Sequence, residues 1–186
     1  MSRNAWIAIG VVVFLLVVGG GGAVVVKWTE ERRRVRVELR KASRRFGLVP
    51  EYLEAIAGVE NRWRISGTNL AGPDGARGGA WGATQITERT ARGHGYTGAM
   101  AALNADPALA AEWTGRILAA AHGRRRLTTL ADYVAAWNAG RDDADKNNDG
   151  RLDELPESHP TRRDYLPRAE SALAAVRASP VPESVA

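Results

Sequence analysis

Hydrophobic side chains recur at helical spacing along most of the chain, and this pattern predicts a mostly α-helical fold. Over 50–60, an apolar face and one carboxyl group fall on the same side of the predicted helix. The residues on that face are Leu53, Ile56, Ala57 and Glu60. Further helices are predicted over 87–92, from 107 to about 122, from 128 or 129 onward, and over 167–178. No apolar–polar alternation is long enough to indicate a strand.

The segment 6–26 is a valine-rich run without a charged residue. Its length suits a helix that crosses a bilayer, with Trp6 and Trp28 at the ends as interfacial anchors. A cleaved signal peptide is the alternative, with the glycines at 19–22 as a small-residue cleavage region. We favour a retained transmembrane anchor or signal-anchor over 1–27.

The rest of the chain divides into three parts by composition. The segment 28–46 carries many charges of both signs and predicts a charged linker helix, either a solvated spacer or a basic face that touches anionic lipid headgroups. The segment 47–178 has enough apolar residues for one folded domain with a core. The proline-containing segment 179–186 predicts a disordered tail.

Residue usage excludes several kinds of chemistry. The 186 residues include no cysteine, which excludes disulfides and thiolate nucleophiles. The three histidines, His94, His122 and His159, form no zinc-binding motif. The formal net charge of +5 suits an enzyme attracted to an anionic polymer, and also a nucleic-acid-binding protein.

Glu60 is the strongest candidate for acid–base chemistry. Its place on an apolar helix face predicts that the carboxyl group is withdrawn from water, which raises the pKa and suits a general acid near neutral pH. Glu51 and Glu54 fall in the first turns of the same helix, where acidic residues suit the helix dipole without a functional role.

Four short blocks accompany Glu60 in a fixed order. They are Val59-Glu60-Asn61, Gly79-Ala80-Trp81-Gly82-Ala83-Thr84-Gln85-Ile86-Thr87, Ala135-Ala136-Trp137-Asn138-Ala139-Gly140 and Tyr165-Leu166. Over about 46–177 these blocks resemble the soluble lytic transglycosylase family, which cleaves peptidoglycan on a lysozyme-like fold. Asn61, Thr84 and Trp137 stand where that family usually has Ser, Met and Tyr. The Glu that the family usually has shortly before the last Tyr is not matched.

The resemblance implies a lysozyme-like domain and a mechanism with a single carboxyl group. Glu60 would act first as acid and then as base, cleaving the β-1,4 bond between N-acetylmuramic acid and N-acetylglucosamine to leave a 1,6-anhydro end. The resemblance assigns substrate-binding roles to Gly82, Gln85, Trp137, Asn138 and Tyr165.

Two alternatives stay open. Asp74, between Pro73 and Gly75, is either a turn residue or a group that positions water, as aspartates in goose-type lysozymes do. In the second case the enzyme would be a hydrolase acting on the same bond. The other alternative is a non-catalytic, membrane-anchored protein that binds glycan or nucleic acid through its arginine runs at 32–34 and 124–126.

A second motif, within 145–157, resembles an EF-hand calcium loop. Oxygen ligands would come from Asp145, Asn147, Asp149, the Arg151 carbonyl and Asp153. Pro156 stands where the loop usually ends in Glu, with Glu157 one residue later. We predict a structural Ca²⁺ at this loop, which the chemistry itself does not require.

The expected partners are peptidoglycan and a membrane, and the domain would face the cell wall. The basic residues that follow the anchor would stay in the cytoplasm under the positive-inside rule. Either that rule is overridden here, or the membrane is that of a virion. The glycine-containing anchor resembles the signal-anchor-release segments of some phage endolysins.

Overall fold

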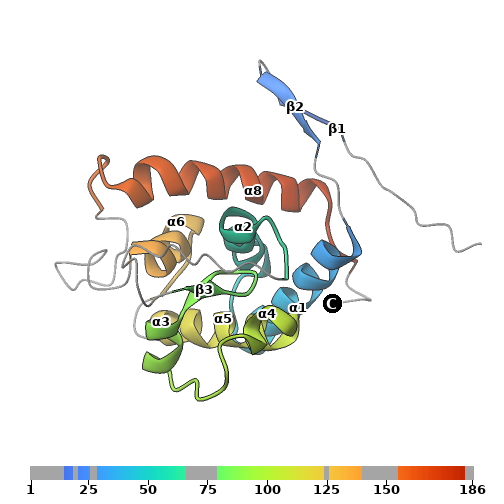
Figure 1. The fold of residues 1–186 in the computed structure, drawn as a ribbon. Helices are drawn as coiled ribbons and strands as arrows, with labels where there is room; N and C mark the ends of the chain where they lie inside the picture. The colour runs from blue at the N-terminus through green and yellow to red at the C-terminus, as the bar shows by residue number, and fades with distance from the viewer. Residues whose placement is uncertain are drawn as a thin grey trace, which may run out of the picture.

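The computed structural model describes residues 15–18, 21–25, 29–65, 79–123, 126–139 and 155–182. This part of the chain is mostly helical, which confirms the prediction of a mostly α-helical protein (Figure 1). The α-helices are α1 (Glu30–Arg45), α2 (Pro50–Asn61), α3 (Glu88–Gly93), α4 (Ala102–Ala105), α5 (Pro107–His122), α6 (Leu130–Val134) and α8 (Leu166–Ala178). Two π-helices are η1 (Ala135–Ala139) and η2 (Thr161–Tyr165). The strands are β1 (Leu15–Val18), β2 (Gly21–Val25), β3 (Ala80–Trp81) and β4 (Ile86–Thr87).

Capping side chains explain where several helices begin. The Asp106 carboxylate accepts hydrogen bonds from the backbone N–H groups of Ala108 and Leu109 at the start of α5. Thr129 and Asp132 form a capping box at the start of α6. These caps confirm the helix starts that the sequence predicts at 107 and after Thr129.

Helix α2 lies inside the fold, beneath α8 in the view of Figure 1. It packs against α8 and α1, and α1 in turn packs along α5. Because Leu53, Ile56 and Ala57 are fully buried, the predicted apolar face of α2 is confirmed as a core face. Glu60 lies at the C-terminal end of this face.

The buried side chains form two clusters, which we call the first and second core. The first core unites α1, α2, α6 and α8, and its larger members include Leu39, Leu53, Ile56, Tyr133 and Leu173. The second core lies around α3, α4 and α5, and its larger members include Ile86, Tyr96, Leu103 and Ile117. Trp137 is partly buried and packs against both cores, so it lies where the two meet.

The segment predicted as a charged linker is instead part of the folded domain. α1 buries Val35 and Leu39 in the first core. Arg36 and Arg40 are also buried on this helix, at 2% and 7% exposure. A solvated spacer would keep such cations in water, because an arginine is rarely buried without a partner.

The N-terminal segment differs from the predicted membrane helix. Its described residues form strands β1 and β2, which pair antiparallel and lie apart from the helical body in Figure 1. β-branched valines favour strands. The remainder of 6–26 lies outside the described residues. Within the described residues, none of the helices has the length and apolar character needed to span a bilayer.

The first part of the C-terminal segment, 179–182, differs from the prediction of a disordered tail, and 183–186 lie outside the described residues. The structure describes this segment as far as 182, and Val181 is only 4% exposed. Burial of this apolar side chain offsets part of the entropy cost of ordering the segment.

Candidate active site

Glu60 lies in the last turn of α2, and its side chain is partly buried. The hydroxyl of Tyr165 donates a 2.7 Å hydrogen bond to Oε1 of Glu60. The side chain of Trp137 also forms a hydrogen bond with the carboxyl group. Because an indole N–H can only donate, Glu60 receives two donors from residues far away in the sequence.

Burial raises the pKa of Glu60 above its ordinary value. The hydrogen bonds from Tyr165 and Trp137, and the positive charge of Arg168, act in the opposite direction by stabilising the ionised form. Burial also raises the pKa of Tyr165 far above its ordinary value, so this hydroxyl keeps its proton. The pair therefore keeps a neutral donor beside a carboxyl group whose pKa is raised.

The donors to Glu60 come from the two π-helices. Trp137 lies in η1, which continues α6, and Tyr165 is the last residue of η2, directly before α8. The two π-helices pack against each other. A π-helical turn is wider than an α-helical turn and is frequent at functional sites. Here the wide turns carry the side chains that meet the carboxyl group.

Asn138 lies beside Trp137 in η1 and is exposed. Its Oδ1 accepts a 2.7 Å hydrogen bond from Oγ1 of Thr161 in η2. Thr161 is 2% exposed, so the residue that donates this hydrogen bond is buried. Since Oδ1 is occupied, the amide N–H₂ of Asn138 keeps its donors for a ligand. Thr161 is a positioning residue that no sequence signal indicated.

Gly82 and Gln85 form the turn between β3 and β4. The Nε2 of Gln85 donates a 2.9 Å hydrogen bond to the carbonyl oxygen of Gly82. Gly82 has φ +74, and a Cβ there would lie 3.0 Å from the carbonyl oxygen of Leu103. Its N–H donates to Oδ1 of Asn104 at 2.7 Å. The turn therefore requires glycine at 82. Within the same turn, the Gly82 carbonyl oxygen holds the Gln85 side chain.

The backbone after Glu60 is held in an unusual conformation. Arg62 and Trp63 both have positive φ, at 51 and 58. The Nε1 of Trp63 donates a 2.7 Å hydrogen bond to the carbonyl oxygen of Glu54, and its ring packs against Gly58. Such strain persists only where packing determines the backbone, and it concentrates at functional sites. The buried Trp63 thus fixes the C-terminal turn that carries Glu60.

Arg168 also supports this site, although the sequence did not indicate it. Its Nη2 donates a 3.1 Å hydrogen bond to the carbonyl oxygen of Val59. Its guanidinium carbon lies 5.8 Å from the centre of the Tyr165 ring. The spacing i, i+3 between Tyr165 and Arg168 was the only available signal, because it places them on one helix face.

Glu54 differs from its interpretation as an acid that suits the helix dipole. It is fully buried and forms ion pairs with Arg36 and Arg40 of α1. Burial raises the pKa of Glu54, while the charges and hydrogen bonds of the two arginines oppose that rise. The sequence signal that was overlooked is the spacing i, i+4 of the two arginines beside the apolar positions Val35 and Leu39.

Two sets of predicted residues lie outside the described residues. They are Asp74, and the calcium ligands Asp145, Asn147, Asp149, Arg151 and Asp153. Within the described ranges, no group of three or more His, Cys, Asp or Glu side chains could hold a metal ion.

The structure thus brings together Glu60, Trp137 and Tyr165, with Asn138 adjacent. This arrangement can donate a proton from a partly desolvated carboxyl group, and the exposed Asn138 follows Trp137 in η1. Comparisons with models of protein families and with curated proteins found no match to this chain.

Proposed function

We propose that this chain is a peptidoglycan lytic transglycosylase with a lysozyme-like domain and that Glu60 is its single acid–base residue. One observation carries the proposal: the Glu60 carboxyl group is partly buried at the end of a core helix and is held by Tyr165 and Trp137. Its raised pKa supports the role of a general acid near neutral pH. The order of the four sequence blocks supports the substrate class.

The proposed reaction has two proton transfers and no water. Glu60 first gives its proton to the glycosidic oxygen, and the bond from that oxygen to C1 of N-acetylmuramic acid breaks. The ionised Glu60 then takes the proton of the C6 hydroxyl of the same sugar. The C6 oxygen forms the new bond to C1, which yields the 1,6-anhydro ring and returns Glu60 to its protonated form.

A single carboxyl group is consistent with the surroundings of Glu60. Most glycosidases use two carboxyl groups. Among the groups that shift the pKa of Glu60, there is no second carboxyl group from the described residues. Asp164 is next to Tyr165 in sequence, but it is exposed and paired with Arg163. The hydrolase alternative would require Asp74, which lies outside the described residues, to position water.

Sugar binding is assigned to groups around the carboxyl group. The amide of Asn138 has free donors for an acetamido or hydroxyl oxygen, and Thr161 fixes its orientation. Trp137 offers an aromatic surface between the two cores. Gly82 and Gln85 form the turn that would make a second contact with the glycan.

The calcium loop at 145–157 and membrane association through the N-terminal segment remain predictions. The proposed location is at the cell wall side of a membrane, or in a virion.

The test is clearance of purified peptidoglycan by the full chain and by Glu60→Gln. We expect the substitution to reduce the rate by at least about 100-fold, because it removes the transferable proton. Glu170→Gln is the matched control, since Glu170 is an exposed carboxyl group on α8 away from these contacts. Unchanged clearance by Glu60→Gln would refute the assignment.

Mass spectrometry of the products separates the two reaction types. Anhydro ends support the transglycosylase, whereas reducing ends would assign the chain as a hydrolase. Retained binding of Glu60→Gln to peptidoglycan, without clearance by either form, would favour the non-catalytic alternative.

A further inference from the structure

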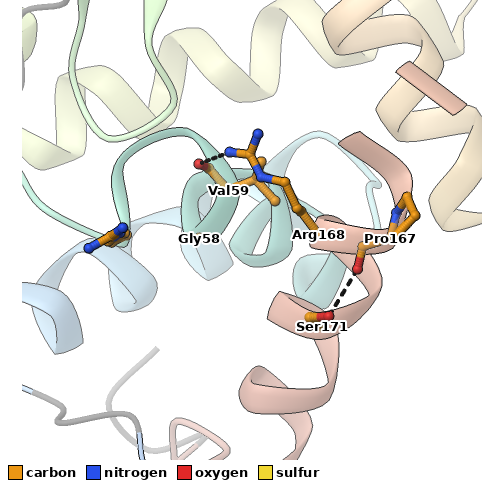
Figure 2. Close-up of a pocket in the computed structure, with 6 residues that line it drawn as sticks. Gly58, Val59, Pro167, Arg168 and Ser171 are labelled. Atoms are coloured by element: carbon orange, nitrogen blue, oxygen red, sulfur yellow. Dashed lines mark hydrogen bonds between the residues drawn. The ribbon is translucent and has the colours of Figure 1, made fainter. Parts of the chain in front are cut away.

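An open pocket of about 370 Å³ lies between the C-terminal turn of α2 and the first turns of α8 (Figure 2). Its lining residues are Gly58, Val59, Arg62, Pro167, Arg168 and Ser171. The pocket is formed by the same two segments of the chain that carry Glu60 and Tyr165. Val59 directly precedes Glu60, and Arg168 is one helical turn beyond Tyr165.

The pocket carries two positive charges and no negative side chain. Arg168 reaches from α8 to the carbonyl oxygen of Val59, as Figure 2 shows, and uses only its Nη2 for that bond. Arg62 is exposed, and its guanidinium group makes no ion pair with the side chains that the structure describes. A guanidinium group has five N–H donors, so both arginines keep donors for a ligand.

We propose that this pocket binds a carboxylate of the peptide attached to the glycan strand, through Arg62 and Arg168. The inference rests on the proposed function and adds a second recognition element to the same substrate. Guanidinium groups match carboxylates in shape as well as charge. While the peptide is attached, the sugars offer no such anion, because the lactyl carboxyl of N-acetylmuramic acid is part of an amide bond.

The position of the pocket agrees with the chemistry of the substrate. The peptide is attached to N-acetylmuramic acid, the sugar whose C1 reacts beside Glu60. A carboxylate on that peptide therefore lies near the bond to be cleaved. Phosphate groups of other wall polymers share the same anionic chemistry, and the competition experiment below distinguishes them from the peptide. The pocket would select peptide-bearing strands and hold the muramic acid in register with Glu60.

Binding is measured in the Glu60→Gln background, so that no turnover occurs. The probes are fluorescently labelled soluble glycan strands with their peptide carboxylates free, and the same strands after coupling to ammonia has converted those carboxylates to neutral amides. Fluorescence anisotropy gives the Kd for each. We expect Arg62→Gln to weaken binding of the strand with free peptide carboxylates by about three- to fivefold, the range for an exposed charge pair. Adding Arg168→Gln should increase the loss to about tenfold or more.

Three controls keep the result specific. Arg177→Gln removes an exposed arginine from α8 that does not line the pocket, and it should leave the Kd unchanged. Arg62→Lys retains the charge and should recover part of the affinity. Thermal unfolding of each variant checks that the fold is intact.

Equal losses on strands with free and with amidated peptide carboxylates, or no loss on either, would overturn the proposal. Competition by a phosphate-bearing wall polymer but not by the free peptide would also overturn it. The two proposals fail separately. Cleavage without dependence on the peptide removes only the pocket assignment, whereas peptide-dependent binding without cleavage removes only the enzymatic one.

Discussion

The hydroxyl of Tyr165 donates a 2.7 Å hydrogen bond to Oε1 of Glu60, although the two residues are separated by 105 positions in the chain. The bond joins the last turn of α2 to the start of α8, two helices that pack extensively against each other. Packing of the two helices therefore fixes the carboxyl group before any substrate binds. Such preorganisation is what acid–base catalysis needs.

Tyr165→Phe should shift the pH dependence of activity upward. The hydrogen bond from Tyr165 lowers the pKa of Glu60, so its removal raises that pKa further. Because the first step needs protonated Glu60, the alkaline limb of the kcat profile should move to higher pH. We also expect kcat to fall about tenfold, because the carboxyl group is less well oriented.

The measurement is a pH–rate profile of peptidoglycan cleavage. Tyr96→Phe is the control, since the hydroxyl of Tyr96 donates to the carbonyl oxygen of Ala99 and is remote from Glu60. A downward shift of the alkaline limb for Tyr165→Phe would contradict this account of the hydrogen bond.

Glu60→Gln should stabilise the protein at neutral pH. The folded-state pKa of Glu60 is raised above its ordinary value of 4.5, so folding favours the protonated form. Its contribution to the free energy of unfolding is fully present below pH 4.5 and is lost as the pH rises through the folded-state pKa. A neutral glutamine avoids this loss. We expect the free energy of unfolding to increase by about 1 kcal/mol at pH 7, the size of gain found when a destabilising functional residue is replaced.

Urea denaturation at pH 4 and pH 7 checks this prediction. The difference between wild type and Glu60→Gln should shrink at the lower pH, where the wild-type carboxyl group is protonated in both states. Glu170→Gln should show no comparable change, because Glu170 is exposed. If Glu60→Gln lowered the free energy of unfolding at pH 7, burial of the ionised carboxyl group would not be the dominant effect of Glu60 on stability.

Glu54→Gln should destabilise the fold strongly. It would leave Arg36 buried without a countercharge and Arg40 with only its 3.8 Å pair to Glu51, at 3% and 9% side-chain exposure. Breaking a buried ion pair from one side costs about 3–5 kcal/mol. Replacing all three charged residues together by apolar ones should recover most of that loss, because the unpaired charges are then gone.

The free energy of unfolding from urea denaturation measures both effects. Glu88→Gln provides the matched comparison, since it breaks an exposed i,i+4 pair with Arg92. That substitution should cost about 0.3–0.5 kcal/mol. Similar costs at Glu54 and Glu88 would mean that the buried cluster contributes little.

Gly58→Ala should lower stability through a direct clash. A Cβ at position 58 would lie 2.4 Å from the ring of Trp63 and 3.0 Å from Cβ of Ala172. The ring would have to move away from the carbonyl oxygen of Glu54, to which its Nε1 donates. Overpacking of this kind costs about 1–3 kcal/mol.

Thermal unfolding compares this variant with Gly93→Ala. A Cβ at Gly93, the last residue of α3, meets no atom within 4 Å. The control should be neutral or slightly stabilising, because alanine has the higher helix propensity. If the two variants had equal melting temperatures, Trp63 would not be tightly packed on α2.

The sequence by itself determined the helices with clear local signals. Pro50 in the first turn of α2, Asp106 before α5 and Thr129 before α6 act through neighbouring backbone groups, so their effects are readable within a few residues. The apolar face that ends at Glu60 also follows from spacing alone. Local signals also misled, since the valine-rich N-terminal segment predicted a helix where the structure has strands β1 and β2.

Only the tertiary structure decided which charged and polar groups meet. The charges of α1 suggested a solvated linker, yet Arg36 and Arg40 are buried because Glu54 lies opposite them on α2. Likewise, the partners of Glu60 come from η1 and η2, far along the chain. Periodicity shows which face of a helix is buried, but the pairing between two faces depends on how the helices pack. An unpaired buried charge costs free energy, so packing that pairs these groups is favoured. That packing depends on contacts between distant segments, which no short stretch of sequence can specify.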